Sequence, residues 1–281
     1  KMDKFITQNK WRIFLSLIYS ISIYGFIQLI FGDVSTWWFI AALVWSKIVQ
    51  VIGHSIGMHR YFSHHSFDTT ITGEKVMAWF SFLLGIGSPI QYARNHRHHH
   101  RAVDTKNDLH SPSNDGKLKT ALGFWAFHDV TWFLNKGTEN VRDLIRHPTY
   151  KFINNWYYTM WYMLLIFGFL INWKIAVFLI AMPSFIYHME LNIFVNCIGH
   201  SWGYRNFNTN DASKNNKWVQ HWTLGEGLHN NHHEHCHLYD FAVKNDESDF
   251  SAWIIEKFLA IPGKHTSAGK VRIPSTSTQE Y

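Results

Sequence analysis

The stretch IFLSLIYSISIYGFIQLIFG, residues 13–32, contains twenty residues and no charged side chain. At 1.5 Å per residue, a helix of this length covers the roughly 30 Å hydrocarbon core of a bilayer. Three further apolar stretches have similar lengths, at 34–53, 152–173 and 175–198. Aromatic residues lie at the ends of several of them, as in an interfacial belt. The sequence therefore predicts an all-α integral membrane protein with four transmembrane helices in two hairpins.

The segment 76–93 is also apolar, but Gly85, Gly87 and Pro89 interrupt it. Histidine-rich clusters follow both this segment and the second apolar stretch. A membrane crossing at 76–93 would place these clusters on opposite sides. If the clusters serve one site, this segment is an interfacial helix rather than a span. Four spans return both termini to one side, and the Lys and Arg excess of the polar segments makes that side cytoplasmic.

The composition limits the class of protein. Charged residues make up only 16% of the chain, well below the average of about 25% in soluble proteins. Two cysteines cannot build a disulfide framework, and the net charge of +6 suits anionic partners such as lipid head groups. No motif indicates binding to nucleic acid. We expect one membrane domain over 1–281, with a cytoplasmic helical cap at 54–155 and 199–262 and a flexible tail at 263–281.

Four histidine-containing groups stand out in the polar segments. They are HRYFSH (59–64), HRHHH (96–100), NCIGH (196–200) and HNNHH (229–233). Positions i, i+3 and i+4 share one face of a helix, so the H-x2-HH spacing of the second and fourth groups directs three imidazoles the same way. His59 and His64 are about 140° apart around an α-helix. These two are therefore expected to diverge and to serve two metals.

The groups supply more imidazoles than one metal ion binds. A zinc ion usually takes four ligands, or three plus water, so eight or nine histidines favour two ions. Imidazole binds iron, zinc, copper or nickel, and the ligand type alone leaves the metal open. Three carboxylates are candidates to accept the outer ring N–H of a ligand and fix its tautomer: Asp104, Asp108 and Glu226. The remaining histidines are expected to lie outside the metal site, with His110 intermediate: His54, His65, His98, His128, His147, His188, His221 and His265.

The order, spacing and flanks of these groups resemble those of the membrane-bound fatty acyl desaturases, particularly the delta-9 stearoyl-CoA and cyanobacterial acyl-lipid type. The matching stretches are GMHRYFSHHSF (57–67), ARNHRHHHRAVDTKNDLHSP (93–112), FVNCIGHSWGYR (194–205) and LGEGLHNNHHEH (224–235). The resemblance covers roughly residues 10–262 and implies a centre of two Fe²⁺ ions. The ligands that it implies are His59, His64, His96, His99, His100, His200, His229, His232 and His233. Asn196 matches a position that acts on the metal through water.

The resemblance also implies an activity. It implies an oxidoreductase of the EC 1.14.19 type that uses dioxygen to place a cis double bond, of the delta-9 type, in a long-chain acyl group. The acyl carrier is left open between an acyl-lipid and an acyl-CoA, and Arg94 and Lys136 are candidates to contact its head group. Tyr92 and Asn95 depart from the animal acyl-CoA enzymes, which have a tryptophan and an acid there. No haem or flavin motif is visible, so the electrons are expected from an external ferredoxin or b-type cytochrome.

Two alternatives remain at this point. A hydroxylase or ketolase on the same scaffold also begins with hydrogen abstraction, so histidine spacing separates it weakly from a desaturase. A non-catalytic membrane metal-binding protein predicts ionisable residues along a path through the spans. Only Lys47, His188 and Glu190 qualify, which disfavours this second alternative. The extension His235, Cys236 and His237 is expected to be dispensable for metal binding.

Overall fold

The computed structural model describes residues 2–108, 110–123 and 138–263. Within these ranges the chain is helical, and β-structure is limited to isolated bridges. The helical elements are, in chain order, α1 (Met2–Phe31), α2 (Trp37–Val49), η1 (Gln50–Ser63), α3 (Ile71–Leu83), α4 (Pro89–Ala102), α5 (Pro112–Asp115), α6 (Lys117–Ala121), η3 (Thr138–Val141), α8 (Arg142–Ile145), α9 (Pro148–Ile171), α10 (Trp173–Ile175), η4 (Ala176–Ala181), α11 (Met182–Glu190), η5 (Leu191–Cys197), η6 (Ile198–His200), α12 (Lys217–Thr223), α13 (His229–Glu234), α14 (Phe250–Ile254) and η7 (Ile255–Leu259). Lys136, His128, His265 and residues 264–281 of the expected tail lie outside the described residues.

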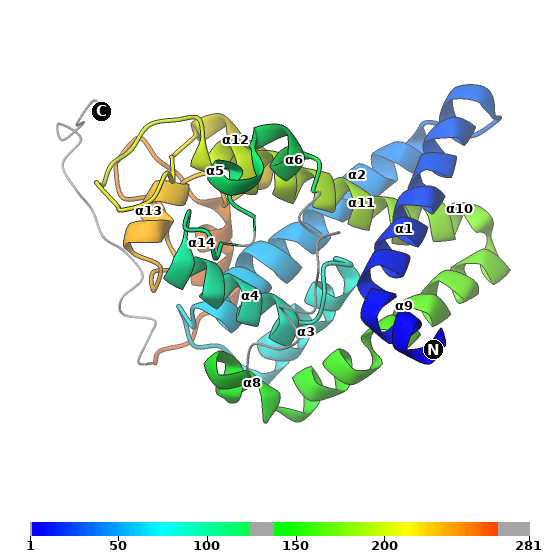
Figure 1. Ribbon diagram of the computed structural model, residues 1–281, viewed down its shortest axis with the longest axis horizontal. Helices are drawn as coiled ribbons and strands as arrows, with labels where there is room; N and C mark the ends of the chain where they lie inside the picture. The colour runs from blue at the N-terminus through cyan, green and yellow to red at the C-terminus, as the bar shows by residue number, and fades with distance from the viewer. Residues whose placement is uncertain (1, 109, 124–137, 264–281) are drawn as a thin grey trace.

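Three helices are long and apolar enough to cross a membrane: Asn9–Phe31, Trp37–Ser63 and Trp173–His200. They correspond to the first, second and fourth apolar stretches. The second continues as π-helix to Ser63 instead of ending near residue 53. Figure 1 shows α1, α2, α9 and α11 gathered at one end of the molecule and the short helices α12, α13 and α14 at the other. The all-helical architecture with a separate cap of short helices is thus present in the described residues.

The third apolar stretch forms α9, a helix of 24 residues, but α9 is not among the helices apolar enough to be counted as spans. One face of α9 packs in the core, where Tyr157 and Trp161 make edge-to-face contacts with Phe14 of α1. The opposite face exposes Phe167 and Leu170, with 63% and 79% of their surfaces accessible. The helix therefore has an apolar outer face as well as a buried one.

The expectation of one continuous helix at 76–93 is wrong, while the placement of this segment at the membrane interface stays a prediction. The structure has two helices there, since α3 ends at Leu83 and α4 begins at Pro89. Gly85 and Gly87 between them have φ angles of +73° and +106°, a region that L side chains avoid and glycine tolerates. Ser88 and Gln91 then form a reciprocal capping box, which starts α4 in a new direction. This turn aims the second histidine group at the end of η1.

Close packing of α3 against η1 fixes the position of the first histidine group. A Cβ atom added to Gly53 would lie 2.5 Å from the carbonyl oxygen of Phe80, so only glycine permits this approach. The Ser81 hydroxyl donates a hydrogen bond of 2.7 Å to the Gly53 carbonyl. On the other side, the Trp161 indole N–H donates to the Phe82 carbonyl at 3.0 Å. The bundle is therefore tied to the helix that carries His59.

Candidate metal centre

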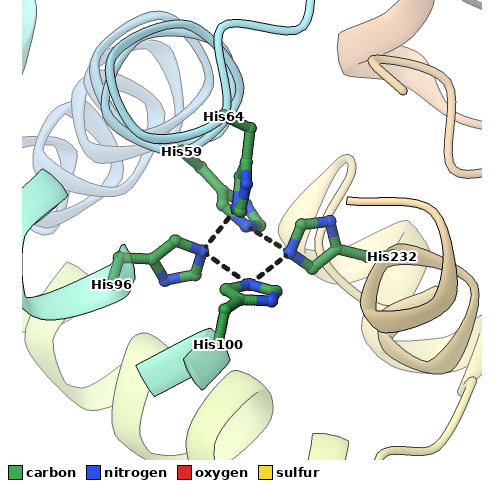
Figure 2. Close-up of side chains that lie close together, drawn as sticks. All are labelled: His59, His64, His96, His100 and His232. Atoms are coloured by element: carbon green, nitrogen blue, oxygen red, sulfur yellow. Dashed lines mark hydrogen bonds between the residues drawn. The ribbon is translucent and has the colours of Figure 1, made fainter. Parts of the chain in front are cut away.

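Five histidines converge at the junction of η1, α4 and α13: His59, His64, His96, His100 and His232. Figure 2 shows their rings turned toward one another, with the Nε2 atoms facing inward. Neighbouring Nε2 atoms lie close together: His64 and His96 at 2.8 Å, His232 and His100 at 2.9 Å, and His100 and His96 at 3.0 Å. We call this set the five-histidine group.

Four further histidines form an adjacent set, the four-histidine group: His99, His200, His229 and His233. The Nε2 atoms of His229 and His200 are 2.9 Å apart, and those of His233 and His229 are 3.1 Å apart. Both H-x2-HH motifs divide between the groups. For example, α13 directs His232 to the first group and His229 and His233 to the second. The same helices therefore build both groups, and all nine histidines expected from the resemblance come together.

The expectation that His59 and His64 diverge is wrong, because both belong to the five-histidine group. The physical reason is the backbone of η1. This segment is π-helical, and the His64 amide N–H bonds to the His59 carbonyl at 3.3 Å. In a π-helix the hydrogen bonds join residues five apart, so positions i and i+5 stack instead of lying about 140° apart.

The nitrogen spacing can be compared with that around a metal ion. With metal–nitrogen bonds of about 2.1 Å, neighbouring ligands are about 3.0 Å apart in an octahedral site and about 3.4 Å apart in a tetrahedral one. The Nε2 contacts of 2.8–3.1 Å match the octahedral value. Two neutral imidazoles facing one another through Nε2 can share only one proton, and a cation satisfies all the lone pairs at once. The residues therefore fit two metal ions in adjacent sites.

Carboxylates hold the outer nitrogen of four of these rings. The Nδ1–H groups donate to Glu226 from His59 at 2.6 Å, to Asp108 from His99 at 2.9 Å, to Asp104 from His200 at 3.2 Å, and to Asp211 from His233 at 3.3 Å. With Nδ1 protonated, each ring presents a lone pair at Nε2. The first three carboxylates are those expected from the sequence. Asp211 was missed because it lies in a loop, with no helical spacing to any histidine group.

Burial sets the protonation state of the centre. It lowers the pKa values of five rings well below the usual value, with neighbouring histidines adding to the shift: His64, His96, His100, His229 and His232. Burial also lowers the pKa of His233 to about 4. Burial raises the pKa of Asp104, but its bond to His200 outweighs this and lowers the pKa to about 2. Neutral imidazoles beside ionised carboxylates are the forms that metal binding requires.

A buried network of ion pairs includes Glu226, the carboxylate that accepts from His59. The guanidinium of Arg60 is fully buried and lies 2.8 Å from both Glu226 and Asp249. It also donates to the carbonyl oxygens of Gly225 and Tyr239 at 2.9 Å and 2.8 Å. This network joins η1 to the loops on either side of α13. Sequence reasoning did not single out Arg60 or Asp249, although Arg60 lies within the first histidine motif.

Other candidate residues lie around the two groups. The Asn196 side chain donates to Asn192 at 3.2 Å and lines a cavity of about 60 Å³ that adjoins the histidines. His110 packs against His99, with ring centroids 4.5 Å apart and ring planes tilted by 33°. Together with His99 and Asp108, it forms a third potential metal-binding set. His54 lies outside both groups, with Nε2 2.7 Å from the Tyr92 hydroxyl.

Three of the remaining expectations concern residues further out. Arg94 is partly buried, and its carbonyl accepts a hydrogen bond from Asn140 at 3.0 Å. Lys136, its expected partner at the carrier head group, is not among the described residues. Residues 235–237 follow α13 and belong to none of the potential metal-binding sets in the described part of the chain.

Nine histidines in two groups that could hold metal ions, together with three helices that could span a membrane, are features of histidine-rich membrane metalloproteins. The fatty acid desaturase family model matches residues 35–241, most of the chain, and the protein belongs to this family. It is 33% identical over 255 residues to the chloroplastic "Probable lipid desaturase ADS3.2" of Arabidopsis thaliana, over 84% of this chain and 63% of that protein. It is 31% identical over 243 residues to Arabidopsis thaliana delta-9 acyl-lipid desaturase 1, over 80% of this chain and 72% of the relative.

Relatives with other printed substrates match to a similar degree. The chain is 30% identical over 247 residues to an icosanoyl-CoA 5-desaturase of Limnanthes douglasii, covering 82% of this chain and 64% of that protein. For some of these relatives, the chain spans less than two thirds of their length. The printed names of these relatives differ in the acyl carrier and in the position of the double bond.

Proposed function

We propose that this protein is an oxygen-dependent fatty acyl desaturase that holds two iron ions in the five- and four-histidine groups. The observation that carries the proposal is the convergence of nine imidazole Nε2 atoms in two adjacent sets in a chain of the desaturase family. Imidazole binds several transition metals, and the choice of iron rests on membership of the desaturase family. Asn196 lies beside the groups and would act through a water molecule.

The reaction consumes dioxygen, two electrons and two protons for each –CH2–CH2– unit, and it yields –CH=CH– and two water molecules. Two bound iron ions supply the oxidising power that side chains lack for an unactivated methylene group. The electrons come from a separate ferredoxin or b-type cytochrome. The chain's own residues position the reactants. Four carboxylates fix the ring orientations, and burial keeps the rings neutral.

The cavity beside the histidines gives the route for the substrate. It is lined on the bundle side by Ile86, Leu191, Val195 and Trp11, which suit an acyl chain. Its volume of about 60 Å³ holds only a few water-sized groups. It therefore accommodates the reacting carbons and dioxygen, and the rest of the chain must enter as lining side chains move. We infer a cis double bond of the delta-9 type, in an acyl-lipid or acyl-CoA whose head group meets Arg94 and Lys136.

We also propose a four-span topology with both termini and the metal centre on the cytoplasmic side. The exposed apolar face of α9 supports its role as the remaining span, because Met163, Phe167 and Leu170 would face lipid. An even number of spans keeps the three histidine-bearing regions in one cap. The interfacial placement of α3 is supported by its exposed apolar residues Ile71, Val76 and Trp79.

Expression in a host that lacks monounsaturated lipids tests the function. Total fatty acids are profiled by mass spectrometry with localisation of the double bond, with a ferredoxin and a b-type cytochrome system supplied in parallel. New monoenes that disappear in a His229→Ala variant of equal abundance are expected. Hydroxy acids in place of monoenes would assign the chain to the hydroxylase alternative. Unchanged lipids with both donors present would refute the proposal.

A further inference from the structure

A second cavity, away from the metal centre, opens on the surface of the cap. Its volume is about 540 Å³, within the roughly 300–1,000 Å³ typical of ligand sites. Its lining residues are Trp202, Gly203, Tyr204, Asn215, Asn216, Lys217, Trp218, Lys244 and Asp246. None of them belongs to a histidine group. We call it the tryptophan cavity.

Lys244 places a buried ammonium, without a hydrogen-bond partner in the described part of the chain, in the wall of this cavity. Only 3% of its surface is exposed, and its ammonium has no hydrogen-bond partner among the described residues. A lysine ammonium carries three donors, and burying it without an acceptor is costly. The acids nearby are engaged elsewhere: Asp246 pairs with Lys217, and Glu247 accepts from Tyr204 and Asn231. An anion in the cavity would supply the missing acceptor.

The rim of the cavity is aromatic and lies close to the membrane helices. Trp218 and Trp202 expose 81% and 67% of their surfaces. Trp222 follows Trp218 by one turn on α12, and its carbonyl accepts a hydrogen bond of 2.9 Å from Lys47, in the helix Trp37–Ser63. This contact places α12 beside the last turn of α2, which belongs to that candidate span. Exposed tryptophans are typical of the membrane interface, where one side of the indole meets lipid.

We propose that the tryptophan cavity binds the phosphate of an anionic glycerophospholipid, with Lys244 as its counter-charge and Trp202 and Trp218 against the glycerol and upper acyl carbons. The two lysines and one aspartate of the lining leave a net charge of +1, which selects an anionic over a zwitterionic head group. The two exposed indoles give a lipid contacts that a free phosphate ion lacks. This site is independent of the proposed desaturase activity.

Asn215, in the lining of the cavity, is hydrogen-bonded to α13, the helix that carries three of the clustered histidines. The Asn215 side chain donates to the Asn231 side chain at 2.7 Å and accepts from the Asn231 backbone N–H at 3.1 Å. Asn231 lies on α13 between His229 and His232. A lipid in the tryptophan cavity would therefore brace the segment that orients the α13 histidines.

Native mass spectrometry of the full chain in detergent tests the site, with phosphatidylglycerol and phosphatidylcholine as the added lipids. One phosphatidylglycerol molecule is expected to bind at least about tenfold more tightly than phosphatidylcholine, because both lipids offer a phosphate but the choline cation is repelled by the net positive charge of the lining. Lys244→Met should remove this preference and Lys244→Arg should keep it. Lys257→Met, a change of the same kind at an exposed position, should leave binding unchanged.

Trp218→Ala provides a second test that does not depend on a buried substitution. It should weaken phosphatidylglycerol binding in a protein with unchanged thermal unfolding, because this indole is largely exposed. Equal binding of the two lipids by the unmodified chain would overturn the proposal. So would full retention of phosphatidylglycerol by both Lys244→Met and Trp218→Ala. Complete displacement of the lipid by an equal concentration of inorganic phosphate would overturn the lipid assignment.

Discussion

Glu226→Gln removes the negative charge of the carboxylate that joins His59 to the buried Arg60. One Glu226 oxygen accepts from His59 Nδ1 at 2.6 Å, and the other accepts from Arg60 at 2.8 Å and from the Ser55 hydroxyl. A glutamine has one acceptor oxygen and one NH2 group in place of these two acceptors. If its oxygen serves His59, its NH2 faces the guanidinium, and donor meets donor.

Two effects of different size follow. Loss of an outer carboxylate partner typically weakens metal binding by about 10–100-fold, and here that loss falls on the five-histidine group. Removing one partner of a buried ion pair costs about 3–5 kcal/mol. Arg60 keeps Asp249 and three carbonyl partners, so the lower end of that range, a loss of about 3 kcal/mol in the free energy of unfolding, is expected.

Iron affinity by chelator competition and thermal unfolding in detergent separate these effects. Asp249→Asn is the matched control, because it breaks the other half of the Arg60 network without touching a histidine. We expect Asp249→Asn to lower stability while iron affinity stays within about twofold, and Glu226→Gln to lower both. Equal iron affinities for Glu226→Gln and the unmodified chain would refute the reasoning. Equal losses of iron affinity in the two variants would refute it as well.

Three further predictions concern other parts of the molecule. Asp211→Asn should weaken binding of one metal equivalent by about 10–100-fold, by chelator competition, because it weakens the hold on His233 Nδ1; an unchanged affinity would remove Asp211 from the site. The metal-free protein should lose stability as the pH falls from 6.5 toward 4, because the pKa of His233 drops from 6.5 to about 4 on folding and the unfolded chain then binds more protons; a flat melting temperature over that range would contradict this. Gly53→Ala should lower the melting temperature, because the added Cβ meets the Phe80 carbonyl at 2.5 Å; an unaltered melting temperature would show that η1 and α3 can separate without cost.

Helical spacing groups six of the nine histidines from the sequence, and the full set of nine follows from the resemblance to a known family. Asp104, Asp108 and Glu226 could be added because each lies within a few residues of a histidine group. Asp211 could not, since its position beside His233 depends on how the loop before α12 folds. Local spacing thus identifies partners on the same segment and misses those brought in by long-range packing.

Backbone geometry accounts for the other differences. The apolar composition of 76–93 continues through Gly85 and Gly87 and therefore predicts one helix. The positive φ angles of these two glycines, which end that helix, depend on the surrounding fold. The polar residues after position 53 predict that the second span ends there. The helix continues to Ser63 instead, because His54, His59 and Arg60 are buried inside the protein. The π-helical form of η1 has no simple signature in the sequence, and it decides that His59 and His64 meet.

The most direct test of two adjacent metal groups is the number of iron ions bound per chain, measured by elemental analysis after anaerobic loading and removal of loose metal. We predict two iron ions in the unmodified protein and one in a His200→Ala/His229→Ala variant, because that variant retains the five-histidine group intact. A single iron ion in the unmodified protein, or the same count in the variant, would contradict the division of nine histidines into two sites.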